Sequence, residues 1–277
     1  MTNRPRRSVL YMPGANARAL EKARILAADS LILDLEDSVA PDAKEQARAS
    51  VAAAVKTGGY GSREVAIRIN GLDTPWGTDD LKMAMEARPD AILIPKVETP
   101  DDLAKMPPGV ALWVMIEKPL AIFNARDLAA SARISCFVLG TNDLLKETRA
   151  SAAGGRFAIL PWLSLAVLAG RAHGLDVIDG VFNNFRDEAA FKAECEQGRD
   201  MGMDGKTLIH PAQIEICNAL FSPSPEDIAW SARIIEAFAL PENASKGVVT
   251  VDGKMVERLH LAMAERTVEI AKAIGHV

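Results

Sequence analysis

The chain has 277 residues, of which 49% are hydrophobic and 25% charged, and its net charge at pH 7 is −5. That length suits one barrel-sized domain or two smaller ones, and the acidic balance argues against general nucleic-acid or anionic-membrane binding. The three cysteines have no CxxC spacing, which predicts neither a disulfide framework nor a zinc knuckle and favours a reducing cytoplasm. The start, MTNRPRRSVLYMPG, lacks the apolar core of a signal peptide, and no segment approaches the length of a membrane span.

Short apolar runs rich in β-formers alternate with longer amphipathic stretches, a pattern typical of parallel strands covered by helices. We expect strands at residues 8–13, 31–36, 65–70, 91–96, 112–117, 136–140, 176–181 and 206–210. We expect helices at residues 17–27, 42–55, 78–87, 120–130, 163–174 and 187–202. Eight such units predict an α/β fold of the closed (β/α)8 TIM-barrel type, with a doubly wound open sheet as the alternative.

The pattern changes beyond His210. Two further helical stretches, at residues 225–240 and 255–275, are joined by a polar link at 241–253. This tail is too short for a second full domain, so we expect a barrel over residues 1–220 and a helical extension over 221–277. Its composition is compatible with a lid, an oligomerisation arm or packing outside the barrel, and favours packing.

Polar and charged residues gather where the expected strands end. They are Asp34, Glu36, Asp37, Arg68, Asn70, Lys96, Glu117 and Asp143. In a barrel these strand ends face one mouth, and charges there are costly unless they are paired, bound to metal or exposed in a site. The group therefore predicts a working pocket, although any one member could instead cap a helix or face solvent.

Carboxylates dominate this group, and hard oxygen ligands in an open mouth suit Mg²⁺. The four histidines lie at no metal-ligand spacing, which argues against zinc. Asp34 lies within its strand, and we interpret it as structural, paired with an arginine or the backbone of a neighbouring strand.

Two further features have both a chemical and a structural interpretation. Arg68 could neutralise an oxyanion that forms during a reaction, or it could form a plain salt bridge near Glu36. The backbone of Gly140, Thr141 and Asn142 could bind a substrate carboxylate at a helix start, or these residues could be ordinary caps.

Lys96 stands where the Schiff-base lysine of a class I aldolase would sit, but nearby carboxylates should keep it charged. No GxSxG, Walker A, GxGxxG or HExxH pattern is present, so serine hydrolase and nucleotide-binding interpretations have no local support.

Several segments together resemble the HpcH/HpaI aldolase and citrate lyase β-subunit family. In chain order they are RRSVLYMPGAN, DSLILDLEDSVAPDAKEQAR, VAIRINGLDTPWGTDDL, AILIPKVETPDDL, VMIEKPLAIFNA, FVLGTNDL and GMDGKTLIHPAQI. The resemblance implies a Mg²⁺-dependent TIM barrel, commonly a homotrimer or a hexamer, acting on CoA or acyl-carrier thioesters such as malyl-CoA, citramalyl-CoA or citryl thioesters.

The resemblance also assigns roles near the expected mouth. Glu117 and Asp143 match the family's metal-binding carboxylates, Glu36 and Asp37 match the acids that hold metal-bound waters, and Arg68 matches the arginine beside the thioester carbonyl. Relatives often have Glu-Thr-Ala where this chain has Glu117, Lys118 and Pro119, a departure that bears on substrate identity.

Farther from the mouth, Tyr11, Asn16 and Lys22 match positions that contact CoA in relatives, with Asn16 in place of an arginine found in some of them. The tail segment VVTVDGKMVERL resembles the family's lid, in which Asp252 would reach into a neighbouring subunit's active site. This implied lid replaces the interpretation of the tail as packing.

The implied activity is cleavage of a β-hydroxyacyl-CoA of the citramalyl-CoA or malyl-CoA type to acetyl-CoA and a 2-oxo acid. Mg²⁺ would hold the substrate's hydroxyl and carboxylate, Arg68 would stabilise the enolate, and Asp252 would transfer a proton. One alternative is a thioesterase acting on malyl-CoA-like substrates. Others are a citrate lyase β subunit acting with an acyl carrier protein, and a metabolite-binding protein without activity.

Overall fold

The computed structural model describes residues 4–276, and the chain forms two compact units. One unit spans residues 6–219, and the other contains the described residues from 220 onward together with Arg4 and Pro5. Within the described residues, no helix is long and apolar enough to cross a bilayer. All three cysteines are buried and free of disulfides.

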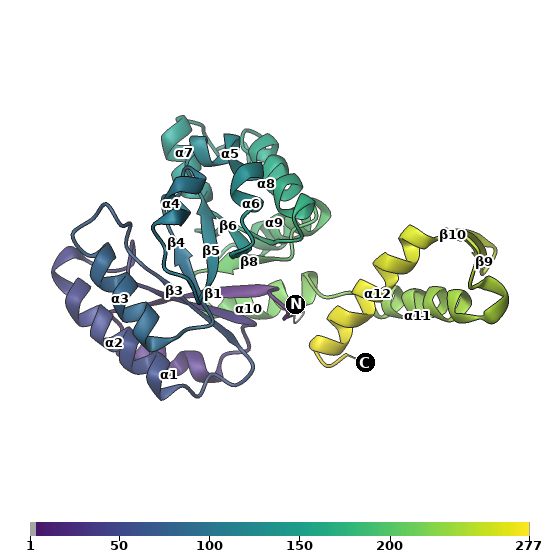
Figure 1. The fold of residues 1–277 in the computed structure, drawn as a ribbon, viewed down its shortest axis with the longest axis horizontal. Coiled ribbons are helices and arrows are strands. Elements are labelled where there is room, and N and C mark those ends of the chain that lie inside the picture. Colours follow the sequence, from purple (N-terminus) through teal and green to yellow (C-terminus); the bar gives the residue numbers. More distant parts are fainter. Residues whose placement is uncertain (1–3, 277) are drawn as a thin grey trace. The chain divides into compact units, whose positions relative to one another are not determined.

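The larger unit is a closed barrel of eight parallel strands arranged in chain order, which confirms the predicted TIM barrel (Figure 1). The strands are β1 Ser8–Pro13, β2 Ser30–Asp34, β3 Glu64–Arg68, β4 Ala91–Ile94, β5 Ala111–Ile116, β6 Ile134–Leu139, β7 Asp176–Asp179 and β8 Gly205–Leu208. The barrel closes where Val9 of β1 pairs with Thr207 of β8. Most strands end one or two residues before the predicted ends, so several charged residues lie in the loops just beyond them.

Both faces of these strands are buried, which explains why they read as continuous apolar runs. The barrel interior is filled by small and large side chains in turn, among them Ile32, Ala66, Leu93 and Trp113. This packing leaves the carboxyl ends of the strands to form a polar mouth.

Helices cover the outside of the barrel. They are α1 Ala17–Lys22, α2 Lys44–Thr57, α3 Gly77–Ala87, α4 Pro100–Ala104, α5 Pro119–Phe123, α6 Ala125–Ala129, α7 Thr141–Thr148, α8 Leu160–Ala172, α9 Glu188–Asp200 and α10 Ile214–Leu220. The single helix predicted at 120–130 is wrong, because the chain breaks at Asn124, whose side-chain amide donates to the Glu98 carbonyl at 2.8 Å.

The smaller unit combines α11 Pro225–Ala239, β9 Val248–Val251, β10 Lys254–Glu257 and α12 Arg258–Ala273. β9 and β10 form an antiparallel hairpin, so the predicted polar link and the predicted helix start at residue 255 are both wrong. Asp252 and Gly253 make the tight turn with φ of 48° and 75°, a geometry that an Asp-Gly pair adopts readily. The hairpin and the two helices share a small core that includes Phe238, Val249 and Val256.

Candidate active site

The carboxyl ends of five consecutive strands bring charged side chains to one mouth of the barrel. Glu36 and Asp37 follow β2, Arg68 ends β3, Lys96 follows β4, Glu117 follows β5, and Asp143 lies in the first turn of α7 after β6. We call these six residues, together with Asp34 of β2, the mouth cluster.

Arg68 is fixed by a bidentate ion pair with Asp34. Its Nε and Nη2 donate to the two Asp34 carboxylate oxygens at 2.7 and 2.8 Å. Burial would raise the pKa of Asp34, but the Arg68 guanidinium overcomes this and holds that pKa below its ordinary value. Asp34 is therefore structural, as predicted, and it leaves Nη1 of Arg68 directed toward the other acids.

The loop that carries Glu36 is held from two sides. Asp34 accepts hydrogen bonds from the backbone N–H groups of Glu36 and Ser38, at 2.9 and 3.2 Å. The buried ammonium of Lys44 donates to the carbonyls of Leu35 and Glu36, at 2.8 and 2.7 Å. The backbone from which the Glu36 side chain extends is thus fixed.

Arg68 also contacts the two acids of this loop, so its salt-bridge interpretation holds alongside any chemical role. Its Nη1 lies 2.9 Å from Glu36 Oε2 and 3.4 Å from Asp37 Oδ2. Burial raises the pKa of Glu36 to about 8; Arg68 opposes the rise, and Glu117 and Asp37 add to it. A carboxyl group with this pKa can exchange a proton near neutral pH.

Lys96 places its ammonium between three carboxylates. Its Nζ lies 3.2 Å from Asp143 Oδ1, 3.3 Å from Glu117 Oε1 and 3.8 Å from Glu36 Oε1. Burial alone would lower the pKa of Lys96, but these carboxylates raise it above its ordinary value. The charged amine is a poor nucleophile, which agrees with the sequence-based judgement against a Schiff base.

Glu117 is fully buried, yet only half of its carboxylate is satisfied. Oε1 accepts the backbone N–H of Lys96 at 2.7 Å, whereas Oε2 has no hydrogen-bond partner among the described residues. Burial raises the pKa of Glu117, with Lys96 opposing the rise. A buried carboxylate oxygen without a partner is costly, so Glu117 is suited to bind a further cation.

The residues present fit Mg²⁺. This ion commonly uses one or two carboxylates and completes its shell with waters and substrate oxygens, and Glu117 and Asp143 lie within 3.3 Å of one shared position, the Lys96 Nζ. Among the described residues, no group of three histidine, cysteine or acidic side chains is placed to hold a metal.

The segment before Asp143 plays identifiable structural parts, and its predicted substrate-binding role stays a prediction. A Cβ on Gly140 would lie 2.3 Å from the Cβ of Glu117, so only glycine lets Glu117 occupy its place. Thr141 is buried at the start of α7, and Asn142 exchanges side-chain hydrogen bonds with Asn183 at 2.8 and 3.2 Å.

The three residues predicted to contact CoA come from β1 and from the two ends of α1, and that role stays a prediction. Tyr11 lies inside the barrel, and the guanidinium carbon of Arg68 is 4.8 Å from the centre of the Tyr11 ring. Tyr11 therefore supports the mouth. Asn16 caps α1 by accepting the Ala19 N–H at 3.0 Å, and Lys22 is exposed at the end of that helix.

Asp252 belongs to the smaller unit, where its carboxylate pairs with Arg233 of α11 at 2.8 Å. Both side chains are about half exposed, so this ion pair can exchange with solvent or another partner.

Sequence reasoning assigned no part to Lys44 and Asp80, two residues that support the mouth. The Lys44 ammonium donates a hydrogen bond to Asn70 Oδ1 at 2.8 Å. The side-chain amide of Asn70 donates in turn to the buried Asp80 carboxylate at 2.6 Å. The signal was a lysine early in a helix after an acidic loop, but its neighbours come from different strands and cannot be read from spacing.

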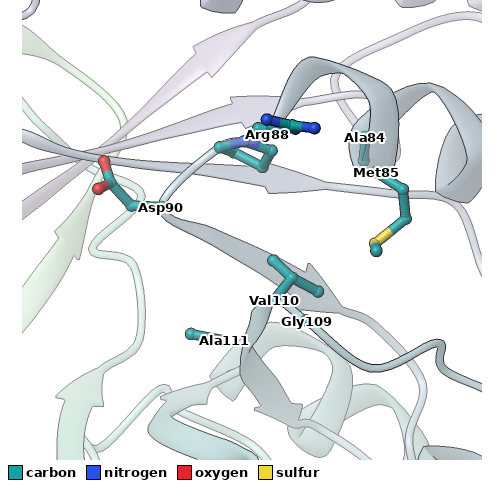
Figure 2. Close-up of a pocket in the computed structure, with 8 residues that line it drawn as sticks. Ala84, Met85, Arg88, Asp90, Gly109, Val110 and Ala111 are labelled. Atoms are coloured by element: carbon teal, nitrogen blue, oxygen red, sulfur yellow. The ribbon is translucent and has the colours of Figure 1, made fainter.

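A cavity of about 380 Å³ lies at the opposite end of the barrel. Figure 2 shows Met85, Arg88, Asp90 and Ala111 around it, and these residues precede or begin β4 and β5. It is lined by loops before the strands, where no mouth residue lies, so it is separate from the candidate active site.

Comparisons with known proteins place these features in a family. The model described as HpcH/HpaI aldolase/citrate lyase matches residues 7–211, and a model of C–C bond lyases of the TIM-barrel fold matches residues 163–276. A (3S)-malyl-CoA thioesterase of Cereibacter sphaeroides is 52% identical over 274 residues, covering 98% of this chain and 96% of that protein.

More distant relatives agree. The citrate lyase subunit beta of Escherichia coli is 33% identical over 284 residues, covering 95% of this chain and 94% of that protein. The structure of CitE from Mycobacterium tuberculosis, in complex with magnesium, acetoacetate and coenzyme A, matches with a TM-score of 0.80 and 26% identity, covering 98% of each chain. The chain belongs to the HpcH/HpaI aldolase/citrate lyase family.

Proposed function

We propose that this protein is a Mg²⁺-dependent thioesterase that hydrolyses (3S)-malyl-CoA or a closely similar β-hydroxyacyl-CoA. The observation that carries the proposal is the 52% identity to a (3S)-malyl-CoA thioesterase along 98% of the chain, because that match spans every mouth residue. It moves the preferred reaction from carbon–carbon cleavage, implied by the family resemblance, to thioester hydrolysis.

The mouth cluster has the parts that this reaction needs. Glu117 and Asp143 would hold Mg²⁺, which supplies a positive centre for the hydroxyl and carboxylate oxygens of the substrate. Arg68 is held in place by Asp34, and its Nη1, which pairs with Glu36 and Asp37, would donate to the thioester oxygen as negative charge develops there.

Glu36 is suited to act as the general base. Burial raises its pKa to about 8 in the metal-free chain, and hydrogen bonds of its backbone with Asp34 and Lys44 hold its loop. The carboxylate would take a proton from water while the water oxygen bonds to the thioester carbon. The carbon–sulfur bond then breaks, and the proton passes to the departing thiolate to give malate and CoA.

Carbon–carbon cleavage is the second candidate, favoured by the family model and by citrate lyase relatives at 33% identity. Arg68 would then stabilise an enolate, and Asp252 from a neighbouring subunit of a trimer or hexamer would transfer the proton. Mixing Glu117→Gln chains with Asp252→Asn chains tests this shared site. Restored activity supports it, and an inactive mixture contradicts it.

The test of the reaction is a product assay with (3S)-malyl-CoA and Mg²⁺. We expect one free thiol and one malate for each substrate consumed, with no glyoxylate. Equal amounts of acetyl-CoA and glyoxylate without free thiol would show that the reaction is carbon–carbon cleavage and not hydrolysis. Turnover only of an acyl-carrier-protein thioester would instead identify a citrate lyase β subunit.

A further inference from the structure

We propose that Lys96 is an internal counter-cation of the metal site: its ammonium balances the carboxylates when no metal is bound and is displaced when Mg²⁺ enters. This inference rests on the Mg²⁺ site of the proposed function. It concerns how the chain keeps that site formed and what affinity the site has for metal.

The position of the ammonium is the first observation. It lies 3.2 and 3.3 Å from the two carboxylates assigned to Mg²⁺, and 3.8 Å from Glu36. A divalent ion bound by the same two carboxylates would have to lie close to this nitrogen. Two cations a few ångströms apart in a partly buried site repel strongly, so binding is an exchange of one for the other.

The Lys96 side chain has a route out. It is 32% exposed, whereas the Arg68 side chain is 8% exposed and held by a bidentate pair. Lysine is a flexible point charge that loses little specific geometry when it moves, and arginine at this place would not share that freedom. Of the two cations in the mouth cluster, Lys96 is therefore the one that can leave.

The Lys96 main chain holds the Glu117 carboxylate through a contact that does not involve the ammonium. Lys96 has φ of 55°, a left-handed conformation that is unfavourable for a non-glycine residue. In this conformation its N–H donates to Glu117 Oε1 at 2.7 Å. The main chain thus orients Glu117 independently of the ammonium, and Oε2 remains without a hydrogen bond.

Lys118, in the loop after β5, supplies a matched comparison with Lys96. It is adjacent to Glu117 in sequence, but its ammonium pairs with Glu147 at 3.2 Å and not with the mouth acids. Removing its charge should leave the metal site unchanged.

The experiment measures Mg²⁺ binding by calorimetry to the wild-type chain, Lys96→Met and Lys118→Met, with denaturant unfolding of each metal-free protein. Methionine has an unbranched side chain one atom shorter than that of lysine, and it keeps the backbone strain of a non-glycine residue but removes the charge. We expect Lys96→Met to bind Mg²⁺ about tenfold more tightly and to unfold more easily without metal. Lys118→Met should match the wild type in Mg²⁺ affinity.

A second measurement uses the wild-type chain alone, so it does not depend on the variant folding. Acetic anhydride labelling followed by mass spectrometry should show faster acetylation of Lys96 when Mg²⁺ is added, with Lys118 unchanged. Unchanged labelling of Lys96, or Mg²⁺ affinity in Lys96→Met equal to or below that of the wild type, would overturn the inference. Failure of the wild type to bind Mg²⁺ would instead overturn the metal-dependent function itself.

Discussion

Two clusters of charged side chains lie in the same barrel, and they differ in their numbers of acids and cations. The mouth cluster holds five acids and two cations around the carboxyl ends of β2 to β6. A second group, which we call the outer cluster, consists of Arg156, Asp179, Glu194 and Lys206 beside β7, β8 and α9. It has two acids and two cations.

Pairing in the outer cluster is mutual. The ammonium of Lys206, fully buried, contacts Asp179 at 2.8 Å and Glu194 at 2.6 Å, and Arg156 contacts the same two acids at 2.6 and 3.2 Å. Burial would raise the pKa of Asp179, but Lys206 and then Arg156 overcome this and lower it. Each charge is thus stabilised by an opposite one.

In the mouth cluster, which has a surplus of acids, two of the carboxyl pKa values shift upward instead. Burial raises the pKa of both Glu36 and Glu117 because two cations cannot compensate five carboxylates. A balanced buried cluster therefore serves packing, whereas the surplus negative charge at the strand ends fits the added cation that we propose there.

The largest effect is expected from a substitution that removes one cation from the outer cluster. Lys206→Met should lower the free energy of unfolding by about 3–5 kcal/mol, because it leaves two buried acids with one partner. Denaturant unfolding by circular dichroism measures this change. Lys192→Met, at an exposed position of the same α9, is the control. A loss below about 1 kcal/mol would show that the outer cluster is not a structural anchor.

A change of opposite character is expected at the mouth. Glu117→Gln should lower kcat for the thioester by about 10²–10³, because it weakens the metal site. The metal-free variant should be at least as stable as the wild type, since a buried surplus charge is removed. Glu147→Gln, which removes the partner of Lys118, is the matched control for both measurements. Wild-type turnover in Glu117→Gln would exclude this carboxylate as a ligand.

The barrel and its mouth could be predicted because both depend on short-range signals. Apolar runs of strand length carry the fold, and parallel strands in a barrel necessarily send their carboxyl ends to one side. This is why Glu36, Arg68, Lys96, Glu117 and Asp143 lie together as expected.

What could not be predicted depends on distances between elements. Asp179 and Lys206 read as ordinary strand residues, and their pairing with Arg156 follows only from the closed sheet. The position of the Lys96 ammonium among three acids likewise follows from a left-handed backbone that no spacing reveals. The hairpin around Asp252 and Gly253 did carry a signal, the Asp-Gly pair between two alternating runs, which the polar link obscured.

The smallest expected effect is a change of stability with pH, which should have opposite signs for the two clusters. The pKa of Glu36 is raised to about 8 from an unfolded value near 4.3, so between these values the folded chain holds more protons than the unfolded chain. Stability of the metal-free protein should therefore fall as pH rises from 5 to 8, by at most about 1.4 kcal/mol per pH unit from this group. Asp179, with a lowered pKa, has the opposite sign: its contribution is present above about pH 4 and is lost as pH falls further.

Urea unfolding of Glu36→Gln between pH 5 and 8, without metal, checks the mouth half of this contrast. The variant should lose most of the downward slope, because glutamine does not titrate, and Glu147→Gln, outside the mouth cluster, should keep it. Added Mg²⁺ should flatten the wild-type curve as well, since a bound cation stabilises the charged form of the neighbouring carboxylates. Equal slopes for the wild type and Glu36→Gln would mean that the surplus charge is relieved elsewhere, and the distinction between the two clusters would no longer rest on Glu36.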